Sequence, residues 1–239
     1  MDATGGVARA AESGKAADPA TAPHAESAPR GGRRAEAARN DGRILSAARA
    51  VFVADPGAPI AEVAERAGVG ISALYRRYPS KEDLLRHLCA EGLRRYVAEA
   101  QAALDALDLG EDPWDAFAGF MRRVVDADTH SLTLRLAGTF TSTDELRREG
   151  MLANELNMRL FERTKAAGAI RADLDVNDLT VIFEQLAAIR VGDERRVRQL
   201  RHRYLALVLE AMHVPSAVPL PGPPPTWQEI SARFAGPAR

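Results

Sequence analysis

The chain has 239 residues and a mass of 25.8 kDa, a length that suits one or two domains. Hydrophobic residues make up 46% and charged residues 27% of it, as in ordinary globular proteins, and the formal net charge is -1. Any field that attracts nucleic acid must therefore be local. Cys89 is the single cysteine, which excludes an intramolecular disulfide and a multi-cysteine metal site. No apolar run is long enough to span a bilayer and no secretory signal is recognisable, so we expect a cytoplasmic protein without a membrane partner.

The first 40 residues differ from the rest in composition. Within residues 2–40, Val7 is the only large apolar residue. Such a segment buries too little apolar surface to offset the entropy that is lost on ordering. We therefore expect a disordered tail over residues 1–40.

Helical spacing of apolar residues continues from residue 41 to residue 212, and no segment shows the alternating pattern of a strand. A first helix is expected behind a cap at Asn40 or Asp41. Pro59 suits the first turn of a short second helix, and Gly68 suits the left-handed conformation that follows its last turn. The first three helices are expected over residues 41–54, 60–67 and 71–78.

Ser80, with Asp83 three residues later, resembles a capping box that starts a long fourth helix. Proline occupies six of the eleven positions from Pro215 to Pro225, which excludes a helix there. The later helices are expected to begin near residues 113, 131, 144, 176 and 194. We predict an all-α chain with four segments: a tail (1–40), a three-helix helix-turn-helix domain (41–88), a helical bundle (89–213) and a Pro-rich tail (214–239).

Residues 59–85 have the pattern of a helix-turn-helix, in which two short helices are joined by a tight turn at Gly68. Ala64 is small where the second helix crosses it, and Leu74 faces inward. The residues that remain outward on the second helix are Gly70, Ile71, Ser72, Ala73, Arg76 and Arg77, with the hydroxyls of Tyr75 and Tyr78. This face suits the major groove of double-stranded DNA. Lys81 begins the next helix, where its ammonium and the free backbone N–H groups can meet phosphate.

An ordinary helical hairpin with a solvated Arg76–Arg77 pair is the alternative interpretation. Against it, the exposed helix is about two turns long, and so short a helix is marginal without partners. The segment also combines two tyrosines with three cations, a mixture expected where side chains contact phosphate. We therefore favour DNA binding by residues 41–88.

Three pieces of this segment resemble a known family: ILSAARAVF at 44–52, IAEVAERAGV at 60–69 and LYRRYPSKEDLL at 74–85. Residues 41–90 resemble the N-terminal DNA-binding domain of the TetR family of bacterial transcriptional regulators. The later helices are similar to the regulatory domains of that family in layout, and PLPGPPPTWQEI resembles the tails of actinobacterial members. The resemblance implies a homodimeric repressor that binds a pseudo-palindromic operator and is released by a small effector.

For the DNA contacts, the resemblance implies that Tyr75, Tyr78 and Lys81 grip the backbone. Arg76, Ser72 and the Gly70–Ile71 turn would approach base edges or nearby phosphates. The sequence departs from the family at Pro59, where a threonine often bonds phosphate, and at Gly70, where a serine often caps the helix. Ile71 and Ala73 offer only apolar contacts, such as those with thymine methyl groups.

The basic end of the tail has two interpretations. Arg30, Arg33 and Arg34 stand a few residues before the first expected helix, near enough to reach the DNA backbone or a minor groove. A solvated leader without a role explains the same composition, and both interpretations stay open.

The second half of the chain contains most of the Phe and Met residues, and long helices around such side chains can enclose an apolar cavity. We predict that an apolar or amphipathic effector binds between Phe117, Met121, Leu156 and Phe183, with a filled core as the alternative. Homodimer contacts are expected from residues 176–212. Two apolar faces repeat there over several turns: Leu179, Phe183 and Leu186, and then Leu200, Tyr204 and Val208. The alternative is that both faces only close the monomer's own core.

No pattern in the sequence indicates catalysis or a cofactor. Five histidines are scattered, and none has the spacing of a zinc protease site. Asp126, Asp128 and His130 could hold a metal, but a polar helix end is the simpler interpretation, so no metal is predicted. Two other classes stay open. One is a helical ligand-binding or scaffold protein whose helix-turn-helix no longer binds DNA, which Pro59 favours, and the other is an enzyme.

Overall fold

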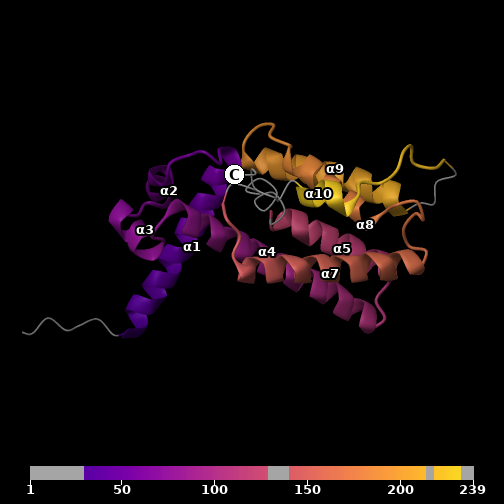
Figure 1. The fold of residues 1–239 in the computed structure, drawn as a ribbon, viewed down its shortest axis with the longest axis horizontal. Helices are drawn as coiled ribbons and strands as arrows, with labels where there is room; N and C mark the ends of the chain where they lie inside the picture. Colours follow the sequence, from indigo (N-terminus) through magenta and orange to yellow (C-terminus); the bar gives the residue numbers. More distant parts are fainter. Residues whose placement is uncertain (1–29, 129–139, 214–217, 233–239) are drawn as a thin grey trace, which may run out of the picture. The chain divides into compact units, whose positions relative to one another are not determined.

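The computed structural model describes residues 30–128, 140–213 and 218–232, with side chains from Arg39 onward. Every regular element in these ranges is a helix and none is a strand, so the all-α prediction is confirmed (Figure 1). Contacts divide the chain after Ala37, and residues 38–239 form one unit. The short helix expected over residues 131–140 lies outside the described ranges, apart from Phe140.

Helix α1 spans Arg30–Ala54. The prediction of a start behind Asn40 or Asp41 is wrong, because both residues lie inside this helix. Alanine, arginine and glutamate favour helices and fill residues 33–39, and no proline interrupts α1. The tail that was predicted to be disordered is therefore helical from Arg30 onward. Residues 1–29 and the side chains of the three tail arginines lie outside the described part.

Helices α2 (Ile60–Ala67) and α3 (Ile71–Arg77) agree with the predicted bounds to within one residue. Gly68 joins them with a φ of 64°, a left-handed conformation that is costly for a residue with a Cβ. Its N–H donates to the carbonyl oxygen of Glu65 at 3.0 Å, which satisfies one of the free carbonyls at the end of α2. The predicted turn is confirmed.

The longer helices that the structure describes after α3 begin at the positions predicted from the sequence. Ser80 Oγ accepts from the Asp83 N–H at 3.0 Å, at the start of α4 (Lys81–Asp108). The side chains of Thr143 and Asp175 accept from the first turns of two later helices in the same way. The remaining bounds are α5 (Pro113–Asp126), α7 (Asp144–Ala166), α8 (Val176–Ala187) and α9 (Glu194–His213).

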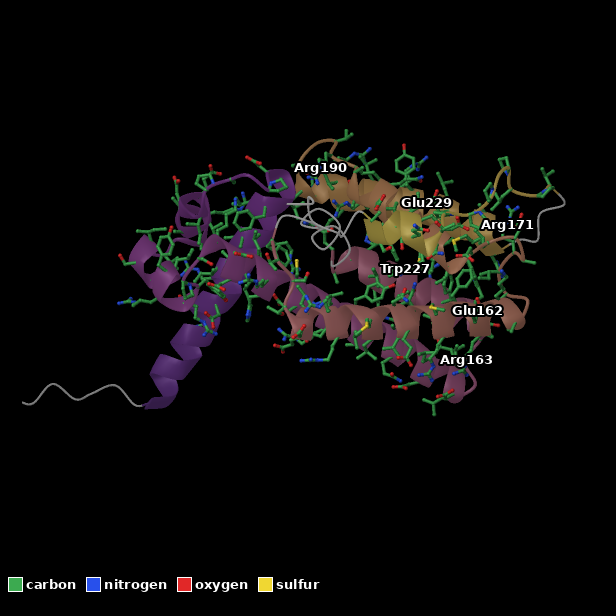
Figure 2. All side chains as sticks on the ribbon, viewed as in Figure 1. Glu162, Arg163, Arg171, Arg190, Trp227 and Glu229 are labelled. Atoms are coloured by element: carbon green, nitrogen blue, oxygen red, sulfur yellow. The ribbon has the colours of Figure 1, made fainter. Side chains whose placement is uncertain are left out.

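Helix α10 (Trp227–Ala232) lies in the predicted Pro-rich tail, where no helix was expected; it packs against α8 and buries Ile230. Trp227 lies on this short helix (Figure 2). The segment before it is held by Arg171, whose Nη2 donates to the Val218 carbonyl oxygen at 3.0 Å, and by Asp173, which accepts from the Leu220 N–H at 2.8 Å. The Arg171 guanidinium and this N–H hold the pKa of Asp173 well below its usual range.

Two apolar clusters form the core. The first joins α1, α2, α3 and the start of α4 around Phe52, Leu74 and Leu88, and it includes Leu146 from the first turn of α7. The second joins the far half of α4 to α5, α7, α8 and α9 around Phe117. We call α1–α3 with the start of α4 the head, and the rest of α4 through α10 the body. Helix α4 belongs to both and connects them (Figure 1).

Candidate DNA-binding surface

The outer face of α3 is exposed, and the helix is held by one buried side chain, Leu74. The exposed residues of this face are Ile71, Ser72, Tyr75, Arg76 and Arg77, and Ala73 is half-buried. Gly70 precedes the helix with an extended backbone and gives it no side-chain cap. No acidic side chain of the described residues pairs with Arg76, so its guanidinium is available to an external acceptor.

Arg77 is exposed but is already paired with α1. Its Nε donates to Asp41 Oδ1 at 2.8 Å and its Nη2 lies 2.7 Å from Asp41 Oδ2. The hydrogen bond from Arg77 to the Asp41 carboxylate raises the pKa of Arg77. This arginine therefore fixes α3 against α1, and contact with DNA would require it to exchange or share that partner.

Tyr78 is buried, with 4% of its surface exposed, and its hydroxyl oxygen is shielded from solvent. Its ring packs edge-on against His87 with 5.5 Å between the ring centroids. Burial raises the pKa of Tyr78. The prediction that its hydroxyl points outward is wrong, because Tyr78 follows Leu74 by four residues and lies on the same side as that anchor.

Lys81 is half-buried and closes the loop between α1 and α2. Its Nζ donates to the carbonyl oxygens of Pro56 at 2.9 Å and Ala58 at 2.7 Å, and it lies 5.0 Å from the centroid of the Phe52 ring. Two of the N–H donors of the Lys81 ammonium are therefore used inside the head, and one donor remains. The predicted contact between this ammonium and phosphate therefore has only the remaining donor, and phosphate binding by Lys81 stays a prediction.

Known proteins resemble this chain in sequence and in fold. The HTH-type transcriptional repressor LfrR of Mycolicibacterium smegmatis is 39% identical over 85 residues, which are 35% of this chain and 41% of that protein. The solved TetR regulator from Mycobacterium vanbaalenii is 27% identical, and the match covers 76% of this chain and 99% of that one with a TM-score of 0.50. For the regulator SCO0520 from Streptomyces coelicolor, the identity is 25%, the coverage 74% and 99%, and the TM-score 0.51.

Two family models also match. The model for bacterial regulatory proteins of the tetR family matches residues 44–88, and the model for the C-terminal domain of SbtR-like transcriptional regulators matches residues 112–214. Together they span more than half of the chain. The chain belongs to the TetR family. Membership of this family of transcriptional regulators confirms the predictions of a DNA-binding regulator and of a protein that is not an enzyme.

In this TetR-family chain, polar contacts join the head to the body. Arg49 of α1 donates from Nη1 to the carbonyl oxygen of Ala127, just after α5, at 3.3 Å. Arg66 of α2 donates from Nη2 to Glu194 Oε1 of α9 at 2.7 Å. These contacts join residues far apart in the sequence, so no local pattern could have indicated them.

The four residues that were predicted to bind an effector come together in the body of the TetR-family chain. Phe117, Met121, Leu156 and Phe183 are all buried in the second apolar cluster. Tyr96 packs against the same cluster and carries a polar group. Its hydroxyl donates to Asn157 Oδ1 at 2.9 Å between α4 and α7. Burial raises the pKa of Tyr96, so this hydroxyl stays protonated and acts as a donor at neutral pH.

The two apolar faces that were predicted to form the dimer differ in exposure. Leu179, Phe183 and Leu186 of α8 are buried inside the monomer, so the prediction that they face a second chain is wrong. They close the body's own core because α8 packs against α7 and α9. On α9, Tyr204 is 48% exposed and Leu207 is 59% exposed.

Neither a metal site nor a reactive cysteine is present in the part of the chain that the structure describes. His202 Nε2 lies 2.6 Å from Asp126 Oδ1, and Arg201 Nη1 donates to Asp128 Oδ1 at 2.6 Å, while His130 lies outside the described residues. Burial raises the pKa of Cys89 to about 12, so its thiol is protonated at neutral pH.

None of the described helices is apolar over the length that a membrane crossing needs.

Proposed function

We propose that this chain is a ligand-responsive repressor that binds a pseudo-palindromic operator as a homodimer and is released by a small apolar or amphipathic molecule. The DNA-binding part of the proposal rests on the outer face of α3. There Arg76, which pairs with no acidic side chain of the described residues, and the exposed Tyr75 stand on a helix anchored by Leu74. An arginine that reaches a guanine edge discriminates between bases by about 1–3 kcal/mol. Tyr75 contributes a hydroxyl to the phosphate backbone, which positions the helix without reading sequence.

The test begins with duplexes selected from a random pool by the full-length protein. Arg76→Ala is expected to weaken the selected duplex by about tenfold or more and random duplex much less. Tyr75→Phe should weaken both to a similar extent. Arg95→Ala, which removes an exposed arginine of α4, is the control for total charge. Equal binding by the parent and both α3 variants would contradict this assignment of the recognition face.

The dimer is proposed to form through the exposed apolar stripe of α9. Tyr204 and Leu207 are exposed, and the half-buried Leu200 and Val208 extend the same stripe at helical spacing. A symmetric pair of such stripes is self-complementary, as a two-fold dimer requires. Two recognition helices would then read half-sites about 34–36 Å apart, or a multiple of that distance.

Light scattering tests this interface with matched aspartate variants of α9. Tyr204→Asp with Leu207→Asp should give a folded monomer, because each change places a charge in an apolar contact. Ala206→Asp lies on the other flank of the exposed surface of α9 and should leave a dimer. A dimer that persists in the folded double variant would rule out this interface.

The effector is proposed to enter the body between α4, α5, α7 and α8. Phe117, Met121, Leu156 and Phe183 provide the apolar surroundings, and the Tyr96–Asn157 pair gives a polar group for an amphipathic ligand. A ligand that separates these helices would tilt α4, whose first residue, Lys81, belongs to the head. A roughly 100-fold loss of operator affinity needs a difference of about 2.7 kcal/mol between the two states.

A panel of apolar and amphipathic compounds tests the sensor part with two readouts. An effector should raise the melting temperature of the protein and release a labelled operator. Met121→Lys, which places a charge in the apolar cluster, should abolish both effects if it folds. The milder Leu156→Ala should change the ligand preference without loss of the fold. A broad panel without either effect, on protein that binds its operator, would contradict a small apolar effector.

A further inference from the structure

An open groove of about 610 Å³ lies between α1, α2 and the first turn of α9, within the size range of small-molecule sites. Its lining residues come from both the head and the start of α9, which the contact between Arg66 and Glu194 brings together. Its charged lining residues are Arg39, Arg43, Arg66 and Glu194, and its other lining residues are glycine, serine and alanine. This groove is separate from the outer face of α3 and from the apolar cluster of the body.

The charges of the groove favour an anion. Arg39 and Arg43 are one turn apart on α1, so they lie on the same face of that helix. A Cβ on Gly68 would lie 2.7 Å from Nη2 of Arg43, so the absence of a side chain there leaves room for this guanidinium. Arg66 completes the set from α2. Three guanidinium groups against one carboxylate leave the groove with an excess of positive charge.

The contact between Arg66 and Glu194 is one that an anion can replace. The two atoms are 2.7 Å apart, but the side chains are 52% and 71% exposed, so water screens their attraction. A phosphate carries more charge than a carboxylate and accepts two parallel hydrogen bonds from the fork of a guanidinium. Arg66 can therefore turn from Glu194 to a phosphate at little cost.

The uncharged lining residues are small, so they leave space for the part of a ligand that carries no charge. Gly42, Ala47 and Ala50 leave space beside α1, and Ser46 adds one hydroxyl. Among the described residues no aromatic side chain lines the groove, so no aromatic ring there would stack on a nucleobase. We propose that the groove binds a small organic phosphate, whose phosphate group is held by Arg39, Arg43 and Arg66 and whose remaining atoms lie over the small residues.

Occupation of the groove has a consequence for the rest of the molecule. The phosphate takes the place of Glu194 as the partner of Arg66, which removes a polar contact between α2 and α9. The groove is thus a second ligand site that touches the head directly. It does not depend on whether the apolar cluster of the body binds an effector.

Calorimetric titration of the full chain tests the proposal with paired probes. Adenosine 5′-monophosphate and glucose 6-phosphate should bind, and adenosine and glucose should not. Arg43→Ala and Arg66→Ala should each weaken binding of both phosphates by about tenfold or more. Arg195→Ala, which removes an exposed arginine outside the groove, should leave it unchanged. Glu194→Gln should strengthen binding, because it removes the competing carboxylate and keeps the shape of the side chain.

Three results would overturn the proposal. The first is that phosphates bind no better than their dephosphorylated partners, and the second is that Arg43→Ala and Arg66→Ala behave like Arg195→Ala. The third uses random-sequence duplex at low salt. If duplex displaces adenosine 5′-monophosphate, and the two groove variants weaken duplex binding while Tyr75→Phe does not, the groove holds the DNA backbone instead. Binding gained in Glu194→Gln supports the proposal even if an alanine variant fails to fold.

Discussion

The head and the body bury their helices to different degrees. In α3 one residue of seven, Leu74, is buried, whereas seven of the fourteen residues of α5 are buried. Helix α5 therefore draws stability from apolar contacts along its whole length, and α3 draws it from one anchor and from Arg77, which pairs with α1. A helix as short as α3 is not stable by itself. Its outer face stays exposed because the head holds it from one side only.

The largest effect is expected in the body. Phe120→Ala removes a fully buried ring of the second apolar cluster and should lower the free energy of unfolding by about 3–5 kcal/mol. Urea denaturation followed by circular dichroism measures the loss. Leu109→Ala, at a highly exposed position after α4, is the control and should change stability by no more than about 0.5 kcal/mol. A loss below about 1 kcal/mol would show that the body is not packed as described.

The matching change in the head is Leu74→Ala. It should cost about 2–4 kcal/mol, because the cavity lies under the single anchor of α3. Hydrogen exchange separates the two regions. Amide protection should fall throughout the head and remain in α5 and α7 if the head opens by itself. An equal fall in both regions would show that head and body unfold as one unit. The two regions would then not differ in local stability.

One substitution, glycine to alanine, should have opposite effects in the two regions. Gly68→Ala in the head forces a Cβ into a left-handed conformation and against Arg43, and should cost about 1–2 kcal/mol. Gly150→Ala lies inside α7, where nothing approaches the new Cβ, and should stabilise by about 0.5–1 kcal/mol. The melting temperature should be lower than that of the parent protein in Gly68→Ala and higher in Gly150→Ala. A stabilised Gly68→Ala would contradict the turn between α2 and α3.

The sequence predicted those parts of the fold that local chemistry decides. Ser80 accepts from the backbone of the helix that it was expected to start, and the helices expected near residues 144 and 176 begin at Asp144 and Val176. Gly68 adopts the left-handed turn for the reason that its lack of a Cβ suggested. The start of α1 was placed too late because a cap residue such as Asp41 also occurs inside helices, where its side chain here binds Arg77 instead.

The candidate site was predicted less completely, because contacts between distant residues decide it. Helical periodicity placed Leu74 inward and Arg76 outward, and both are so. It could not show that Lys81 would bind carbonyl oxygens of the loop between α1 and α2. For the same reason the apolar face of α8 was assigned to a dimer, since a face that is buried in the monomer and one that is buried between monomers have the same pattern.

The smallest effect is expected where the two regions meet through Arg66 and Glu194. Both side chains are more than half exposed, so their coupling in a double-mutant cycle should be about 0–1 kcal/mol and should fall with added salt. The cycle uses Arg66→Ala, Glu194→Ala and the double variant, each measured by urea denaturation. A coupling near zero leaves the apolar contacts of α4 and α7 as the main connection between head and body, consistent with Leu146 of α7 lying in the head cluster. A coupling well above 1 kcal/mol that persists in high salt would mean that the pair is shielded from solvent and acts as a rigid link. An anion could then no longer replace Glu194 at little cost, so this small number also decides how readily the neighbouring groove can accept a phosphate.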